Sequence, residues 1–217
     1  MKDLQALRRI VLARHGQTDW NTERRFQGKT DIALNDEGKA QAHALAKRLS
    51  SWQTEAVYSS PLQRALYTAQ AVAAHQGLVP IVLDGLTEVD FGTWEGRSIP
   101  ILEKENKEAL ARWRGDPFFR PPAGAETWDS IAKRLERAVE VILSEAHHRV
   151  ILVSHGGIIR ALYAIMVGLD PHRVWKMNVS NCAMSGVELG PSGASLMFAN
   201  DDLHIRAGEA GQSLPVW

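Results

Sequence analysis

The chain has 217 residues, of which 45% are hydrophobic, and it carries 25 Lys and Arg against 25 Asp and Glu. This length and composition suffice for one substantial core, so we expect a single domain over residues 1–217. The formal net charge of zero argues against a general nucleic-acid or membrane-surface binder, which would need a field of one sign. Cys182 is the only cysteine, which excludes an internal disulfide and a CxxC metal site, and we expect it to be a small buried hydrophobe. No apolar run has the length of a membrane span and the first residues lack a signal-type pattern, so the expected location is cytoplasmic.

Short apolar runs alternate with helical patterns along the first part of the chain. Residues 10–13 predict a buried strand, and the polar residues 19–31 predict a loop after it. Asn35 can cap the helix that follows, in which an apolar stripe at helical spacing continues to Leu49.

A second strand and a second helix follow the same pattern. The strand is predicted at residues 56–58 and the helix at residues 61–75, because proline suits a first helical turn and Gly77 ends the pattern. Arg64 then lies in the opening turn of that helix. Residues 80–83 predict a third strand.

The middle of the chain departs from this alternation, and we expect an excursion at about residues 85–126. Residues 97–122 predict one helix and a proline-rich loop that cover the core as a cap. The aromatic and basic residues in and near this region could contact a substrate, but cap packing and solvated charge are the favoured interpretation. They are Trp94, Trp113, Phe118, Phe119 and Trp128, with Arg112, Arg114 and Arg120.

The alternation of strands and helices returns in the last third of the chain. Residues 127–147 predict a long amphipathic helix, residues 150–153 a strand, residues 157–167 a helix, and residues 184–198 a closing hairpin. Strands separated by helices predict an α/β fold, namely a three-layer α/β/α sandwich with a mainly parallel central sheet and a small helical or loop cap.

Two of the predicted strands end on a His-Gly pair, His15-Gly16 and His155-Gly156. Residues just past such strands lie at the sheet edge where ligands bind, and glycine lets the backbone approach a ligand closely. The sequence therefore predicts that both histidines face one pocket. The other histidines are expected to be surface or satisfied structural residues: His43, His75, His147, His148, His172 and His204.

Two arginines near these positions indicate the class of ligand. Arg14 precedes His15, and Arg64 lies at a helix start. Guanidinium groups match phosphate geometry and a helix N-terminus adds backbone donors, so we expect a bound phosphate dianion. Other arginines are expected on solvated faces: Arg24, Arg25, Arg48 and Arg137.

Four segments, in this order, strongly resemble the histidine phosphatase superfamily, also called the phosphoglycerate mutase-like family. They are residues 12–16, 59–65, 86–96 and 153–157, and the resemblance covers nearly the whole chain. It implies a metal-independent phosphomonoesterase that forms a phosphohistidine and needs no cofactor. The implied catalytic residues are His15 as nucleophile, Glu88 as general acid, and Arg14, Arg64 and His155 as the phosphate pocket. The implied substrate-binding residues are Thr18, Asn21, Gln27, Gly28 and Gly156.

The family contains both hydrolases and mutases, so departures from the mutase pattern carry weight. Val89 and Phe91 stand where cofactor-dependent mutases have Arg and Tyr, Gly157 stands where they have Asn, and Gln27 stands where they have Thr. These differences favour a phosphatase, similar to the branch that includes alpha-ribazole phosphatase and broad-specificity phosphatases. A cofactor-dependent phosphoglycerate mutase is the alternative.

A catalytically idle protein that binds phosphorylated ligands is the alternative of another class. It is disfavoured because all five catalytic positions are filled. The expected partner is a small phosphomonoester substrate, with no nucleic acid and no membrane. A homodimer is left open.

Overall fold

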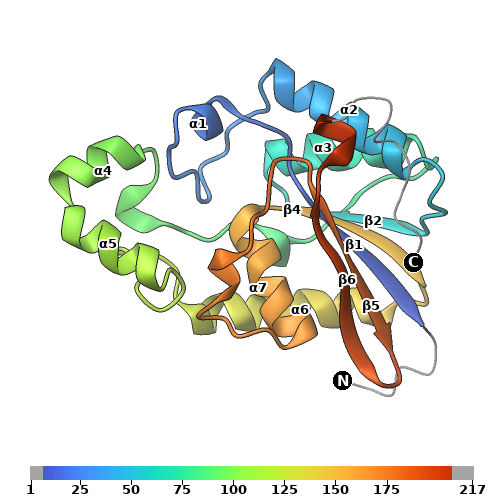
Figure 1. Cartoon of the computed structure of the whole chain (residues 1–217). Coiled ribbons are helices and arrows are strands. Elements are labelled where there is room, and N and C mark those ends of the chain that lie inside the picture. The colour runs from blue at the N-terminus through green and yellow to red at the C-terminus, as the bar shows by residue number, and fades with distance from the viewer. Residues whose placement is uncertain (1–6, 207–217) are drawn as a thin grey trace.

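The computed structural model describes residues 7–206, and these residues form a six-stranded sheet in the order β3-β2-β4-β1-β5-β6 (Figure 1). The first four strands of the chain run parallel, and the last two form an antiparallel hairpin at one edge. The strands are β1 (Arg8–Arg14), β2 (Ala56–Ser59), β3 (Ile81–Val82), β4 (Arg149–Ser154), β5 (Met184–Gly190) and β6 (Gly193–Asp201). The predicted mainly parallel sheet is confirmed. β3 is shorter than the predicted strand, and its two residues are exposed at the sheet edge.

Helices cover both faces of the sheet. α2 (Asp36–Leu49) and α3 (Gln63–Ala74) pack on one face, and α6 (Trp128–Ser144) and α7 (Gly156–Val167) pack on the other (Figure 1). Successive residues of β1 therefore enter different cores: Val11 joins the first, and Leu12 joins the second. Burial on both faces explains why β1 is a continuous apolar run, and it confirms the three-layer sandwich.

Local capping sets the helix starts. Asn35 caps α2 as predicted, because its side chain accepts a hydrogen bond from the Gly38 amide at 2.9 Å. α3 begins two residues later than predicted: Pro61 and Leu62 lie outside it, and Leu62 is extended at φ −67° and ψ 134°. The Ser60 hydroxyl accepts from the Leu62 amide at 3.3 Å, so a serine turn precedes the helix. Arg64 is still in the first turn.

One predicted loop contains a helix. α1 (Asp19–Thr22) forms inside the polar stretch at 19–31 because Thr18 and Asn21 make a reciprocal capping pair. The Thr18 hydroxyl accepts from the Asn21 amide at 3.2 Å, and the Asn21 side chain accepts from the Thr18 amide at 3.0 Å.

The cap contains two helices where the sequence predicted one. After the 3₁₀ turns η1 (Asp84–Leu86) and η2 (Gly92–Trp94), the chain forms α4 (Ile99–Glu105) and α5 (Lys107–Gly115). Asn106 separates them with φ −140° and ψ 39°, outside the helical region. Figure 1 shows both helices standing apart from the sheet, at the far left.

Most of the cap aromatics and arginines pack or pair as expected. Trp94 and Phe118 are buried, Arg112 pairs with Glu108, and Arg114 donates to Glu103 at 2.7 Å. Trp113 differs, because it packs on the Trp94 ring and also lines the cavity described below.

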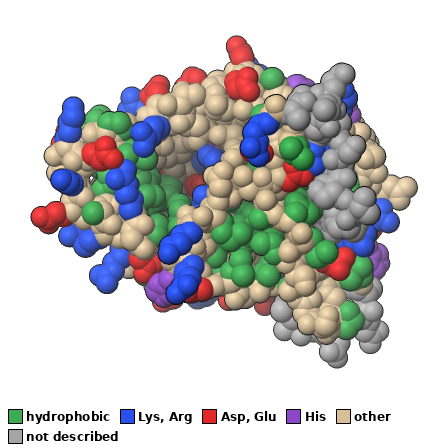
Figure 2. Space-filling model, viewed as in Figure 1, with side chains coloured by type: hydrophobic (Ala, Val, Ile, Leu, Met, Phe, Trp, Pro, Cys, Tyr) green, Lys and Arg blue, Asp and Glu red, His purple; other side chains and the backbone are tan. Residues whose placement is uncertain are grey.

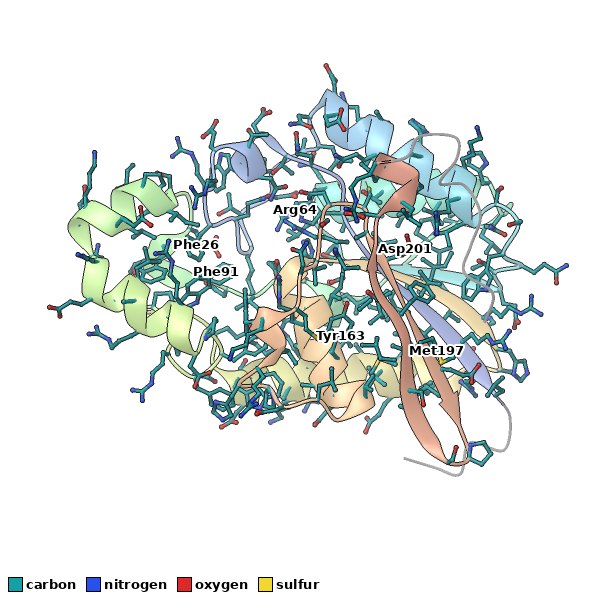
Figure 3. All side chains as sticks on the ribbon, viewed as in Figure 1. Phe26, Arg64, Phe91, Tyr163, Met197 and Asp201 are labelled. Carbon is teal, nitrogen blue, oxygen red and sulfur yellow. The ribbon has the colours of Figure 1, made fainter. Side chains whose placement is uncertain are left out.

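Two other expectations concern buried polar groups. Cys182 is buried as expected, and burial raises the pKa of its thiol. Arg48 is not on a solvated face: it is 1% exposed and pairs with Asp201 of β6, and its helix α2 packs against α8 (Leu203–Arg206). Asp201 is labelled in Figure 3. Within the part of the chain that the structure describes, no helix has both the length and the apolar composition to cross a bilayer.

Candidate active site

His15 lies directly after β1 and is 2% exposed. Its Nδ1 lies 2.6 Å from the Gly16 carbonyl oxygen. A carbonyl can only accept a hydrogen bond, so Nδ1 carries the proton and Nε2 keeps a free lone pair. Burial holds the pKa of His15 well below its ordinary value, and the nearby charges of Arg64 and Arg14 lower it further. The result is a neutral imidazole that can act as a nucleophile through Nε2.

His155 follows β4, the parallel neighbour of β1, and is fully buried. The centroids of the His15 and His155 rings are 5.1 Å apart, so the two His-Gly pairs do meet at one site. The His155 Nε2 atom lies 2.8 Å from the Ser60 hydroxyl. Burial lowers the pKa of His155 well below its ordinary value, with additional lowering from Arg64, His15 and Arg14.

Arg14 and Arg64 present guanidinium groups at the same place. Arg14 Nη1 donates to the Val179 carbonyl at 2.7 Å, and Arg64 donates to the carbonyls of Thr30 and Gly28 at 2.8 and 2.7 Å. In both arginines the Nε atom is buried and has no hydrogen-bond partner among residues 7–206. Burial lowers the pKa of Arg14 to about 10, which still leaves it charged at neutral pH. Buried cationic donors without acceptors are what an anion-binding site requires.

Glu88 is 8% exposed and lies in the segment between η1 and η2, where it contacts the start of α7. Its carboxylate accepts from the Gly157 amide at 3.3 Å and from the Val89 amide at 3.0 Å. A Cβ atom at position 157 would lie 2.7 Å from Glu88 Oε1 and 2.9 Å from Val89 Cγ2. Glycine at 157 is therefore what allows the Glu88 carboxyl to occupy this position.

A second glutamate, which the sequence did not single out, supports Arg64 indirectly. The Glu95 carboxylate accepts from the amides of Lys29 and Thr30 at 2.8 and 3.0 Å and from the Thr30 hydroxyl at 2.6 Å. The same loop supplies the two carbonyls that hold Arg64, and Gly28 in it adopts φ +55°. Glu95 therefore fixes the backbone that positions the Arg64 guanidinium.

His15, Arg14, Arg64 and Glu88 line a cavity of about 270 Å³, the recess between cap and body in Figure 2. In Figure 3, Arg64 lies on the sheet side, and Phe26 and Phe91 lie toward the cap. Most of the predicted site residues line it: Arg14, His15, Asn21, Gln27, Gly28, Arg64, Glu88 and Gly156. The rest of the lining was not among the predicted site residues, although Phe91, Trp113 and Gly157 were noted in the sequence: Trp20, Arg24, Arg25, Phe26, Phe91, Ile99, Trp113, Gly157, Arg160 and Trp175.

Two predicted residues lie behind the cavity wall. Thr18 is fully buried as the cap of α1, and it holds Asn21, which does line the cavity. His155 packs behind His15. Conversely, Arg24 and Arg25 were expected on a solvated face. Arg24 is exposed as expected, but both arginines also line the cavity. The Asn181 side chain, also unpredicted, donates to the His15 carbonyl at 3.1 Å and to Asn21 at 3.2 Å.

Acidification should destabilise the fold because three histidines are buried in neutral form. Besides His15 and His155, burial lowers the pKa of His204 to about 4. Below about pH 6.5 the unfolded chain binds protons that these folded side chains do not, so the free energy of unfolding should fall between pH 7 and pH 5, by up to about 2 kcal/mol for each histidine.

Urea denaturation across this range measures the effect. His204→Gln should make the slope shallower, because it removes one of the three groups. A free energy of unfolding that is constant or rises on acidification would contradict the neutral buried state of these histidines.

The histidine phosphatase superfamily (branch 1) matches residues 10–202. Phosphoserine phosphatase 1 of Hydrogenobacter thermophilus is 29% identical over 198 residues, which cover 91% of this chain and 94% of the relative. Glucosyl-3-phosphoglycerate phosphatase of Mycobacterium tuberculosis is 35% identical over 170 residues, which cover 75% of this chain and 76% of the relative.

Solved structures of phosphatases also resemble this chain. The alpha-ribazole phosphatase of Shigella flexneri superimposes with a TM-score of 0.81 at 26% identity, and the match covers 96% of this chain and 99% of that protein. The phosphatase names among these relatives support the phosphoric monoester hydrolase that the sequence predicts. The chain belongs to branch 1 of the histidine phosphatase superfamily.

Proposed function

We propose that the chain hydrolyses a small phosphomonoester without a metal ion, through a phosphohistidine formed on His15. The observation that carries this proposal is the free lone pair of His15 Nε2 together with two arginines, Arg14 and Arg64, whose buried Nε donors have no acceptor among residues 7–206. Glu88 lines the same cavity and can serve as the proton donor.

The first half of the reaction transfers the phosphoryl group to the protein. His15 Nε2 attacks phosphorus while the bond from phosphorus to the alcohol oxygen breaks. Glu88 gives its proton to that oxygen, so the alcohol leaves neutral. Arg14 and Arg64 face the phosphoryl oxygens; a unit charge about 4 Å from another gains roughly 4 kcal/mol at an effective dielectric of about 20, before desolvation is subtracted.

The second half restores the resting protein. A water molecule attacks phosphorus, and the Glu88 carboxylate takes one of its protons. The bond from phosphorus to His15 Nε2 breaks, phosphate leaves, and His15 returns to its neutral form. We propose that His155, held by Ser60, contributes to the phosphate pocket behind His15, and that Asn21, Gln27, Gly28 and Gly156 contact the phosphate or the substrate.

Hydrolysis is favoured over mutase activity by the surroundings of Glu88. Val89 and Phe91 add no charge beside the acid, and Phe91 packs on Phe26 with ring centroids 5.0 Å apart. The absence of a side chain at Gly157 is coupled to the position of the Glu88 carboxyl. We also propose that residues 1–217 form one domain with its cap at about 85–126, and that the protein acts in the cytoplasm, where its one buried thiol would stay reduced.

Phosphate release from a panel of phosphomonoesters tests this function. It should be run beside a coupled mutase assay on 3-phosphoglycerate primed with 2,3-bisphosphoglycerate. We expect phosphate release and no mutase flux. Mutase flux with little phosphate release would contradict hydrolysis. No activity in either assay would favour a protein that only binds phosphorylated ligands.

Chelators should leave the activity unchanged. Arg14 and Arg64 supply the positive charge that a divalent cation supplies in other phosphoryl-transfer sites. Phosphate release measured before and after EDTA treatment should agree within error. Loss of activity that added Mg²⁺ or Zn²⁺ restores would overturn the metal-free reaction.

A further inference from the structure

The cavity carries more positive charge than the phosphate can neutralise. Five arginines are among the described residues that line it: Arg14, Arg24, Arg25, Arg64 and Arg160. Arg25 pairs with Glu23 outside the lining, and Glu88 is the one carboxylate among the described lining residues. A bound phosphate dianion would still leave two positive charges in excess when Glu88 holds the proton that it gives to the leaving alcohol. This excess fits a substrate with a second anionic group.

Arg160 is placed to bind that group. It lies one turn into α7, and its guanidinium is fixed by donation from Nη1 to the Gly156 carbonyl at 2.9 Å and from Nε to the Met177 carbonyl at 3.0 Å. Its remaining nitrogen, Nη2, makes no hydrogen bond within residues 7–206. Arg14 and Arg160 both surround Gly156, where an added Cβ would lie 3.6 Å from Arg14 Nε and 3.1 Å from Arg160 Nη1. Arg160 therefore neighbours the phosphate pocket.

Trp175 adds a second donor beside Arg160. The Arg160 guanidinium carbon lies 4.8 Å from the centre of the Trp175 ring, and both side chains line the cavity. The indole nitrogen of Trp175 is buried and has no partner among the described residues. A buried N–H without an acceptor is costly, so a ligand oxygen at this position would be favoured.

We propose that Arg160 and Trp175 form a subsite for a carboxylate, and that the substrate is a small phosphomonoester that carries one. This inference rests on the proposed phosphatase function. The free donors are the two N–H groups of Arg160 Nη2 and the one of Trp175, which suit the two oxygens of a carboxylate. The cavity of about 270 Å³ restricts the substrate to a small molecule.

Two matched pairs of substrates isolate the carboxylate. O-phosphoserine differs from O-phosphoethanolamine only by this group, and 3-phosphoglycerate differs from glycerol 3-phosphate by a carboxylate in place of a hydroxymethyl group. We expect kcat/KM to favour the carboxylate member by about tenfold or more in at least one pair, since a hydrogen bond to a charged group contributes about that factor. A smaller preference in both pairs would overturn the subsite.

Two variants assign the preference to these residues. Arg160→Gln should reduce the preference to about threefold or less, and Trp175→Phe, which removes only the N–H, should reduce it in the same direction. Arg173→Gln is the matched control: it removes the same charge from an exposed side chain outside the cavity lining, and it should keep the preference. Retention of the full preference in both Arg160→Gln and Trp175→Phe would contradict the proposal. An equal loss on both members of each pair would assign Arg160 a structural role instead.

Binding without turnover separates this inference from the phosphatase function. In His15→Ala, calorimetric dissociation constants for the same pairs should show the same preference, because Arg160 and Trp175 are intact. If the wild-type chain turned over neither pair but His15→Ala kept the binding preference, the subsite would stand and hydrolysis would not. Equal binding of both members would overturn the subsite.

Discussion

His15→Ala should abolish turnover and the acid-labile phosphoenzyme. His15 is a neutral imidazole that lines the cavity and has a free Nε2 lone pair, and loss of a nucleophile that acts with its supporting groups lowers kcat by about four orders of magnitude or more. Phosphate release under substrate saturation measures the first effect, and rapid quenching with labelled substrate measures the second. His43→Ala, on the exposed side of α2, is the control and should keep full activity.

Binding distinguishes lost chemistry from lost structure in this variant. Arg14 and Arg64 are held by backbone carbonyls and not by His15, so His15→Ala should still bind inorganic phosphate. Full activity in His15→Ala, with the fold intact by thermal unfolding, would remove His15 from the role of nucleophile.

Glu88→Gln should slow the hydrolysis of alkyl phosphates by about a hundredfold or more, and that of p-nitrophenyl phosphate far less. An alkyl alcohol is a poor leaving group unless its oxygen is protonated, whereas p-nitrophenolate leaves with little help. Glutamine keeps an oxygen that can accept from the Gly157 amide but has no acidic proton to give. Initial rates on both substrates, measured at one pH, give the ratio.

The two substrates also separate the roles that Glu88 could have. A similar loss on both would mean that the carboxylate positions other groups and does not act as the acid. No loss on either would mean that another group protonates the leaving oxygen.

Hydrophobic periodicity accounts for how well the fold could be predicted. β1 and β4 are apolar runs because both of their faces are buried, and the stripe that ends at Leu49 follows the buried side of α2. The His-Gly pairs indicated the site because they end adjacent parallel strands. The errors arose where single side chains decide the local structure: the Thr18 and Asn21 capping pair made α1, and Asn106 divided the cap helix.

Tertiary contacts account for the site residues that the sequence missed. Glu95 acts through the backbone of residues 28–30, and Asn181 reaches His15 from 166 residues away, so no local pattern marks them. Arg48 is buried because it pairs with Asp201 of β6 and α8 packs against its helix. Arg160 did leave a signal: it lies four residues after Gly156, so it is on the same helix face as the glycine that opens α7.

The location of the phosphoryl group in the trapped intermediate shows directly whether His15 is the nucleophile. The enzyme should be quenched with alkali during turnover, digested and mapped by mass spectrometry, and the linkage identified by phosphorus NMR. We expect one phosphorylated side chain, His15, bonded through Nε2. A phosphoryl group on His155, a bond through Nδ1, or rapid hydrolysis with no phosphorylated histidine would contradict the role of His15 as nucleophile.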